Sequence, residues 1–494
     1  MDRFTRYSLD PAFCVLDIGQ SGKLTNFSED CKSVKKISLY IALIAVIASL
    51  LAVSQASAQA TLLAVGSLTE SKAGPYTDLS GLDNILENGV PANLLGGLGS
   101  GIAWAGDNTI LALPDRGPNA VPFDSLVDDT VTYIPRFHTV KMSLQPNKSD
   151  TGPPFILTPK LRATTLLYSS HPLVYGTGDG LSIGSGVPPQ NTDWKHYFTG
   201  RSDAFDPNHT SGDPRDARLD SESIRVSNDG RSVFISDEYG PYVYQFDRSS
   251  GRRIRSFRLP SNLFVANLKP VGTDEIADNT SGRTANKGME GLAITPDGRT
   301  LVGIIQAALI QDAAEGGDAA NLLRIVSIDV RSGRTHEYGY LLTTGSGVSE
   351  IVALNQHEFL VDERDGKGRG DDSKAKVKQI FKINLKGAVD IADMDGTTAA
   401  ANAVGKTLFL DLVQLLTANG ITADQIPAKI EGLALGSDVW YNGGKVHTLW
   451  VANDNDFLQD FDAPGANPNQ FFLVGFTDTD LAGSRYVPQQ LREH

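Results

Sequence analysis

The sequence contains very little cysteine. Of its 494 residues only Cys14 and Cys31 are cysteines, and both precede an apolar run from Ile37 to Val53. Lysines before this run and small residues after it, up to Ala58, are typical of a secretory signal peptide. We expect cleavage after Ala58, so residues 1–58 form a leader. The exported chain would then have no disulfide, no thiol nucleophile and no zinc–thiolate site.

A transmembrane anchor is the alternative interpretation of the apolar run. The run is at the lower limit of length for crossing a bilayer, and the small residues that follow it favour cleavage. No other apolar stretch approaches this length. We therefore expect a secreted or periplasmic protein with no stable membrane anchor after signal cleavage.

Positive charge is also in deficit. The chain has 44 Lys and Arg against 58 Asp and Glu, a net charge of −14. Such a surface repels nucleic acids and anionic membranes and suits cations. We expect a monomer that binds no nucleic acid. Without disulfides, a large exported chain is held together by burial, by closure of its sheets or by bound metal.

Helical periodicity is scarce. One amphipathic stretch, from Lys406 to Leu416 before Asn419-Gly420, predicts a short helical insertion near 404–418. Elsewhere the chain consists of short β-rich runs that end in turn signals such as Asp229-Gly230 and Asp297-Gly298. This pattern indicates an all-β sandwich, barrel or propeller.

A repeat favours the propeller. Each copy has a glutamate at the start of an apolar strand and acidic or polar residues at the end of the next strand. The copies are Glu222 with Asp237-Glu238, Glu290 with Gln306, Glu350 with Asp362-Glu363, Glu431 with Asn453-Asp454, and Ser100 with Asp115. At roughly 40–50 residues per blade, the gaps 116–222 and 364–431 leave room for further copies. We predict a single propeller over 59–494 with six or seven blades, closed by pairing of Phe471–Phe476 with Thr61–Val65.

The repeated acids are candidate metal ligands. The first strand of each propeller blade lines the central channel, so these carboxylates would gather around one axis and repel one another unless cations lie among them. Oxygen-only ligands in an exported protein favour Ca²⁺. The predicted metal ligands are Asp115, Glu222, Asp237, Glu238, Glu290, Glu350, Asp362, Glu363, Glu431, Asn453 and Asp454. The alternative is that the acids form internal salt bridges with neighbouring Arg and Lys.

The ordered motifs resemble a known family. Asp115-Arg-Gly-Pro-Asn119, Asp220-Ser-Glu222, Lys287-Gly-Met-Glu-Gly-Leu292, Leu360-Val-Asp-Glu-Arg-Asp365 and Lys429-Ile-Glu-Gly-Leu433 look like the phytase-like domain, also called the esterase-like activity of phytase family. The resemblance runs from about Leu63 to about Phe476. It implies an exported propeller grouped with hydrolases of phosphate esters and of other esters.

By analogy with calcium-dependent propeller phytases, Ca²⁺ held by the acids would activate water against a small anionic ester. Four basic residues would then stabilise the transition state as catalytic residues. They are Arg116, Lys287, Arg364 and Lys429. Two alternatives are a lactonase or esterase-type propeller with one channel Ca²⁺, held by Glu222, Asn453 and Asp454, and a non-catalytic binding module stabilised by channel ions.

Overall fold

The computed structural model describes residues 60–120, 130–176, 184–203, 208, 211–458 and 467–492. The predicted leader and its cleavage site lie outside these residues. No helix in the described ranges is both long enough and apolar enough to cross a membrane.

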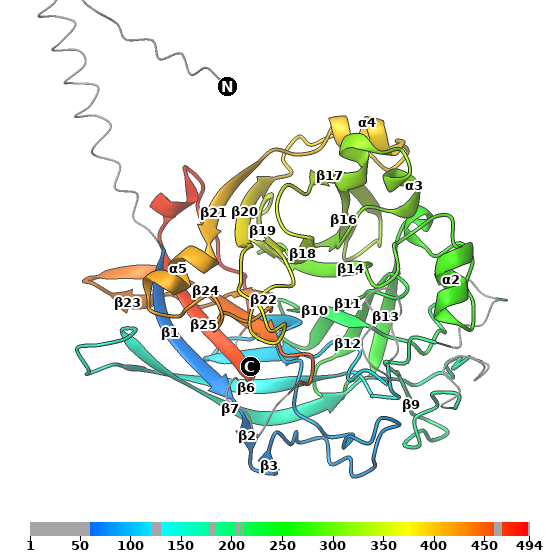
Figure 1. Ribbon diagram of the computed structural model, residues 1–494, viewed down its shortest axis with the longest axis horizontal. Coiled ribbons are helices and arrows are strands. Elements are labelled where there is room, and N and C mark those ends of the chain that lie inside the picture. The colour runs from blue at the N-terminus through cyan, green and yellow to red at the C-terminus, as the bar shows by residue number, and fades with distance from the viewer. Residues whose placement is uncertain are drawn as a thin grey trace, which may run out of the picture. The chain divides into compact units, whose positions relative to one another are not determined.

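Most of the described strands form five antiparallel sheets, the blades of a propeller, arranged around a central axis (Figure 1); β2 (Glu70–Ser71) with β3 (Gly74–Pro75) and β8 (Tyr168–Ser169) with β9 (His196–Tyr197) form two small further sheets. From the axis outward, blade 1 is β4 (Gly101–Trp104), β5 (Thr109–Leu113), β6 (Arg136–Pro146) and β7 (Phe155–Leu166); blade 2 is β10 (Ser221–Val226), β11 (Ser232–Asp237), β12 (Tyr242–Asp247) and β13 (Arg253–Arg258); blade 3 is β14 (Met289–Ile294), β15 (Thr300–Ile305), β16 (Leu322–Asp329) and β17 (Thr335–Leu341). Blade 4 is β18 (Gly347–Ala353), β19 (Glu358–Arg364), β20 (Lys378–Asn384) and β21 (Lys406–Asp411); blade 5 is β22 (Lys429–Leu435), β24 (Gly444–Asp454), β25 (Asn469–Phe476) and β1 (Thr61–Leu68), with β23 (Val439–Tyr441) beside β24.

The prediction of six or seven blades is wrong, because the propeller has five. Each copy of the repeat is one blade, and no blade lies between copies. The gap 116–222 contains β6 and β7, which extend over 11 and 12 residues. It also contains the short strands β8 (Tyr168–Ser169) and β9 (His196–Tyr197). The gap 364–431 contains the two outer strands of blade 4 and two helices. Long outer strands and insertions therefore account for the spacing that suggested extra blades.

Closure of the ring follows the prediction. β1, the first described strand, pairs antiparallel with β25, the last one, and Val65 lies opposite Phe472. In Figure 1 the blue β1 lies beside the red β25. The N-terminal strand thus completes the sheet that contains the C-terminal strands, so the two ends of the ring are joined by a sheet rather than left as free edges.

The inner strands explain why the repeat places a small residue after the glutamate. β10 and β14 are buried along their whole length, because a blade packs on each side of them. A Cβ atom added to Gly291 would lie 2.8 Å from the Ile351 nitrogen of the next inner strand, and one added to Gly432 would lie 2.9 Å from the Gly99 oxygen. The close approach of five inner strands therefore requires glycine at these positions.

The helical insertion predicted near 404–418 is only half helix. Lys406–Asp411 is β21, paired with β20, and α5 covers Leu412–Ala418. The Asp411 side chain accepts a hydrogen bond from the Gln414 nitrogen at 2.9 Å and so caps the helix. The helix ends at Ala418 with Asn419 as its C-cap, so the predicted stop at Asn419-Gly420 is confirmed. The remaining helices are η1 (Ser261–Leu263), α2 (Gly272–Asp278), α3 (Ile310–Ala313), η2 (Gly317–Asn321), α4 (Gly396–Ala401) and η3 (Asp478–Leu481); a small hairpin joins β2 (Glu70–Ser71) and β3 (Gly74–Pro75).

The C-terminal tail crosses the end of the channel at which the inner strands finish. The Gln489 side chain donates to the oxygen of Val226, the last residue of β10, at 2.7 Å. The Gln490 nitrogen donates to the Pro296 oxygen at 3.0 Å, beyond β14, and the Val487 nitrogen donates to an oxygen beyond β18 at 2.8 Å. The tail therefore ties three blades together and leaves the opposite end of the channel for a site.

Candidate functional site

A cavity of about 560 Å³ opens at the end of the channel where the inner strands begin. We call this end the mouth. Its lining includes the carboxylates of Asp115, Glu222, Glu238, Glu290, Glu431 and Asp456, together with the four predicted catalytic residues Arg116, Lys287, Arg364 and Lys429. The structure therefore brings predicted carboxylates and all four predicted basic residues to one cavity.

Strand register shows which residues correspond from blade to blade. Each inner strand from blade 2 to blade 5 has a bulge opposite the second strand, and the bulge holds Glu222, Glu290, Ser349 or Glu431. At the end of the second strand, the corresponding residues are Asp115, Glu238, Gln306, Arg364 and Asp454. Blade 4 is thus the exception: its bulge holds a serine where blades 2, 3 and 5 have glutamates, and its second strand ends in an arginine where the other blades have an acid or a glutamine.

Two predicted ligands of blade 4 lie deeper than the mouth. Glu350 and Asp362 face each other across the β18–β19 pair, one residue beyond the bulge. Glu350 accepts hydrogen bonds from the Ser223 hydroxyl at 2.8 Å and forms an ion pair with Arg225 at 2.8 Å. Burial raises the pKa of Glu350 to about 7, although Arg225 opposes the shift. The charges of this pair therefore meet inside the channel, away from the cavity.

Three further predicted ligands bond to neighbouring strands and loops and do not line the cavity. Asp237 accepts hydrogen bonds from the Tyr239 and Gly240 nitrogens at 3.1 and 3.2 Å. Glu363 accepts one from the Thr344 nitrogen at 2.9 Å and also bonds to Tyr340 and Lys406. The Asn453 side-chain oxygen accepts one from the Gln470 nitrogen at 2.6 Å. Each of these three residues comes one position before the mouth residue at the end of the second strand. Because side chains alternate across a strand, the three point away from the cavity.

Blade 2 supplies an all-oxygen cluster. One carboxylate oxygen from each of Asp220, Glu222 and Glu238 lies within 4.8 Å of the other two. Asp220 pairs with Arg116 at 3.1 Å, and Glu238 accepts a hydrogen bond from the Gly288 nitrogen at 2.9 Å. Glu222 is 6% exposed and makes no hydrogen bond or ion pair with the described residues. Burial, with the charges of Asp220 and neighbouring glutamates, raises the pKa of Glu222 well above its ordinary value.

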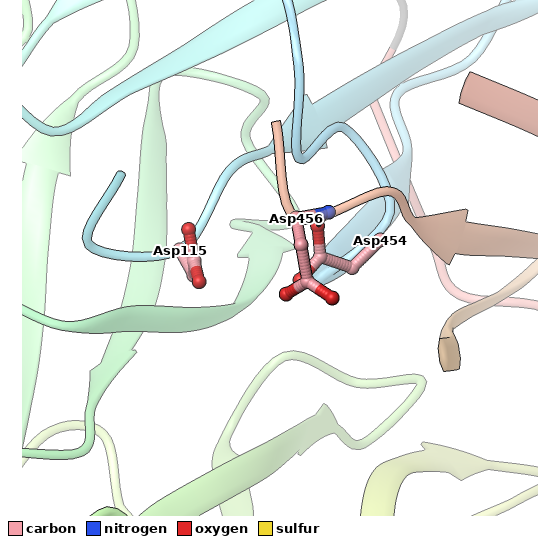
Figure 2. A group of neighbouring side chains, drawn as sticks. All are labelled: Asp115, Asp454 and Asp456. Carbon is pink, nitrogen blue, oxygen red and sulfur yellow. Dashed lines mark hydrogen bonds between the residues drawn. The ribbon is translucent and has the colours of Figure 1, made fainter. Parts of the chain in front are cut away.

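A second cluster joins blades 1 and 5. Figure 2 shows Asp454 and Asp456 next to each other at the end of β24, with Asp115 facing them from the loop after β5. Their carboxylate oxygens also lie within 4.8 Å of one another. Lys429 Nζ contacts Asp454 at 2.5 Å and Asp456 at 2.6 Å. Burial would raise the pKa of Asp454, but the charge and hydrogen bond of Lys429, the Asp456 nitrogen and the Arg116 charge together lower that pKa.

Two basic side chains occupy the blade 3 and blade 4 sides of the cavity. Arg364 donates from Nε to the Ser349 hydroxyl at 2.6 Å, bonds through Nη2 to Glu431, and lies 3.9 Å from Glu290. Lys287 Nζ donates to the neutral Gln306 side chain at 3.1 Å and has no ion pair within the described chain. Burial raises the pKa of Glu290 to about 8, with Glu431 adding to the shift and Arg364 and Lys287 opposing it.

Sequence reasoning missed two members of the clusters, Asp220 and Asp456. Each lies two residues from a predicted ligand, in Asp220-Ser-Glu222 and Asp454-Asn-Asp456. Acids two residues apart on a strand share a face, which is the signal that could have identified Asp220. Asp456 follows β24 in a turn with φ of 52°, and this signal does not extend to it.

The fold and the site define a class of protein: a five-bladed propeller whose mouth combines carboxylate clusters with arginine and lysine. The family model described as phytase-like, "Esterase-like activity of phytase", matches residues 93–457, and the chain belongs to this family. An "Uncharacterized secreted protein" of Arthroderma benhamiae is 30% identical to it over 469 residues, which cover 82% of this chain and 87% of that protein.

Similar solved structures are much more distant in sequence. A periplasmic gluconolactonase of Pseudomonas aeruginosa is 10% identical, with 83% of this chain and 98% of that chain covered and a TM-score of 0.30. A PQQ-bound aldose sugar dehydrogenase of Streptomyces coelicolor is 12% identical, with 85% and 96% covered and a TM-score of 0.30. Likenesses of this size carry no functional argument, and the propeller rests on the strand pairing itself.

Proposed function

We propose that the protein is an exported hydrolase of phosphate esters that uses Ca²⁺ held by Asp220, Glu222 and Glu238. The observation that carries the proposal is Glu222, a nearly buried carboxylate with no partner among the described residues, in a cluster that opens into a cavity with basic residues. The cleavage pattern that ends at Ala58 supports export, as does the word "secreted" in the name of the Arthroderma benhamiae relative.

The cluster fits a hard cation. Its three donors are carboxylates, which Ca²⁺ prefers, and Arg116 is the cation paired with Asp220. Glu222 adds a carboxylate with no ion-pair partner among the described residues, a negative charge that a divalent ion would balance. When bound, Ca²⁺ would neutralise charge on the phosphoryl oxygens and lower the pKa of a coordinated water molecule.

The remaining residues of the mouth would bind and orient the substrate. Lys287 has a neutral partner, so its charge is available to a phosphoryl oxygen. Arg364 is held by Ser349 and Glu431, which fixes its guanidinium before a substrate arrives and reduces the cost of ordering it. A cavity of about 560 Å³ suits a small-molecule ester.

The lactonase alternative has less support. Its proposed shell of Glu222, Asn453 and Asp454 is not assembled, because the Asn453 side-chain oxygen is bonded to the Gln470 nitrogen inside blade 5. A non-catalytic module would have its acids fully paired, and Glu222 does not fit that description.

The test is a substrate panel on the mature protein with Ca²⁺ and with EDTA. The panel contains phytate, p-nitrophenyl phosphate, p-nitrophenyl acetate and a γ-lactone. We expect hydrolysis of the phosphate esters with Ca²⁺ and its loss with EDTA. Full activity after exhaustive EDTA treatment, or hydrolysis of the lactone without hydrolysis of phosphate esters, would contradict the proposal.

Glu222→Gln sharpens this test. It removes the charge but keeps the shape, and we expect calcium-dependent turnover to fall by on the order of 100-fold or more. Calcium affinity, measured by titration calorimetry, should fall with it. Glu70→Gln, in the exposed β2 strand, is the matched control and should behave as wild type.

A further inference from the structure

The two carboxylate clusters occupy corresponding corners of the mouth. In blade 2, Ser221 pairs with Asp237, so the preceding Asp220 lies beside Glu238, whose nitrogen donates to the Asp220 oxygen at 2.9 Å. In blade 5, Ile430 pairs with Asn453 and Lys429 pairs with Asp454. Lys429 in blade 5 therefore occupies the position that Asp220 occupies in blade 2.

The equivalence extends to the other two members of the blade 2 cluster. Glu431 corresponds to Glu222 at the bulge, and Asp454 corresponds to Glu238 at the end of the second strand. The blade 5 corner thus has the arrangement of the blade 2 corner, with a lysine in place of Asp220 and an aspartate in place of Glu238. Asp456 and Asp115 add two further carboxylates to it.

The ammonium of Lys429 lies among these carboxylates. Nζ is 2.5 Å from Asp454, 2.6 Å from Asp456 and 3.6 Å from Glu431. The Asp456 nitrogen donates to Asp454 at 2.8 Å, which holds these two acids together on the turn after β24. Three contacts from one side chain therefore bring a positive charge to the place where an ion coordinated by Asp454 and Asp456 would bind.

We propose that Lys429 is a built-in cation that takes the place of a second divalent ion, so that the mouth binds one divalent ion and not two. The proposal rests on the proposed function only for that single ion, at the blade 2 corner. In the blade 5 corner Lys429 acts as a positioning residue, because it keeps Asp454, Asp456 and Glu431 fixed without a metal.

Removing the ammonium should convert the blade 5 corner into a cation site. In Lys429→Met, Asp454 and Asp456 lose their ion-pair partner, with Asp115 and Glu431 close by. Carboxylates that converge without a neutralising charge either take up protons or capture a cation, and an all-oxygen donor set favours Ca²⁺ when it is present.

The experiment is calcium titration calorimetry on the mature protein. We expect one site in the wild type, two in Lys429→Met, and one again in Lys429→Met/Asp456→Asn. Lys445→Met is the matched control, because Lys445 also pairs with an aspartate, Asp438, at 2.7 Å. This pair lies near the start of β24, at the opposite end of the strand from Asp454. This control should keep the wild-type stoichiometry.

Two ions in the wild type, or an unchanged count in Lys429→Met, would overturn the proposal. Lys429→Arg retains the charge and should retain the wild-type count, so a second site in this variant would also overturn it. If Lys429→Met does not fold without calcium, its refolding on addition of Ca²⁺, followed by circular dichroism, gives the same information: recovery supports the proposal and no recovery overturns it.

The outcome is separable from that of the proposed function. If the wild type binds no calcium but Lys429→Met binds one ion, the blade 5 inference holds and the proposed function fails. If Glu222→Gln loses the wild-type ion and Glu222→Gln/Lys429→Met regains one, the two corners bind independently and both proposals hold.

Discussion

Blade 2 and blade 4 each have four strands and similar sequence motifs, yet they place different side chains at the mouth. Blade 2 places Glu222 at its bulge and Glu238 at the end of its second strand, and both line the cavity. At the same positions blade 4 has Ser349 and Arg364, while its motif acids lie one residue further from the mouth. Because side chains alternate across a strand, a shift of one residue moves an acid from the cavity to the interior.

The shift gives blade 4 two roles that the other blades lack. At the mouth it contributes Arg364, which lies between Glu290 and Glu431. Inside the channel it contributes Glu350, whose partner Arg225 also donates to the Ile102 and Ile351 oxygens at 2.8 and 3.0 Å. The Glu350–Arg225 pair thus joins several inner strands at the axis, and the same blade supplies the positive charge of Arg364 at the mouth.

The largest effect is expected from removing the axial arginine. Arg225→Met leaves Glu350 fully buried without its ion-pair partner, which should lower the free energy of unfolding by about 3–5 kcal/mol. Urea denaturation followed by circular dichroism measures the change. The double variant Arg225→Met/Glu350→Gln removes the unpaired charge and should recover more than half of the loss. A loss below about 1 kcal/mol in the single variant would mean that the pair does not hold the axis.

A smaller effect is expected at the mouth. Arg364→Met removes the fixed guanidinium, and we expect kcat/KM for phosphate esters to fall on the order of 100-fold, or about 2.7 kcal/mol of transition-state stabilisation. The inhibition constant for inorganic phosphate should rise as well. Arg299→Met is the matched control, because the Arg299 side chain is 83% exposed on a distant turn. Unchanged phosphate inhibition in Arg364→Met would show that Arg364 does not bind the anion.

Much of the fold could be predicted from the sequence. The Asp-Gly turns after β10 and β14 have the positive φ that glycine permits, 69° at Gly230 and 71° at Gly298. The apolar run at 471–476 and its partner near residue 61 identified the closure of the ring. The number of blades could not be predicted by spacing, because outer strands and insertions vary in length while the inner hairpin does not.

The site could be predicted only as a set of charged residues around one axis. Which acids reach the cavity depends on where each bulge falls, and a bulge is a property of two paired strands rather than of one. Ser349-Glu350 reads like the Asp220-Ser-Glu222 motif in sequence, but its glutamate lies past the bulge. The partner of Glu350 is Arg225, 125 residues earlier and across the channel, a contact that local sequence patterns do not encode.

The smallest effect concerns Asp362, the second acid that the shift in blade 4 buries. Both of its carboxylate oxygens lack a hydrogen-bond partner among the described residues. Burial raises its pKa from 3.8 to about 8, with Arg364 and Lys378 opposing the shift and Glu431 and Glu350 adding to it. The folded protein therefore holds a proton that the unfolded chain releases above about pH 4, and stability from this group falls as pH rises from about 4 to 8.

Asp362→Asn removes that titration. The variant should match the wild type within about 0.5 kcal/mol at pH 5 and become progressively more stable than the wild type as the pH rises to 9, where the wild type carries a buried charge. Urea denaturation at a series of pH values measures the difference, with the exposed Asp393→Asn as the control. Other buried acids, such as Glu290, keep their own pH dependence in both proteins, so the informative quantity is the gap between the two curves. Parallel curves from pH 5 to 9 would show that Asp362 is not the group that titrates, and that the shift of register in blade 4 has no cost at high pH.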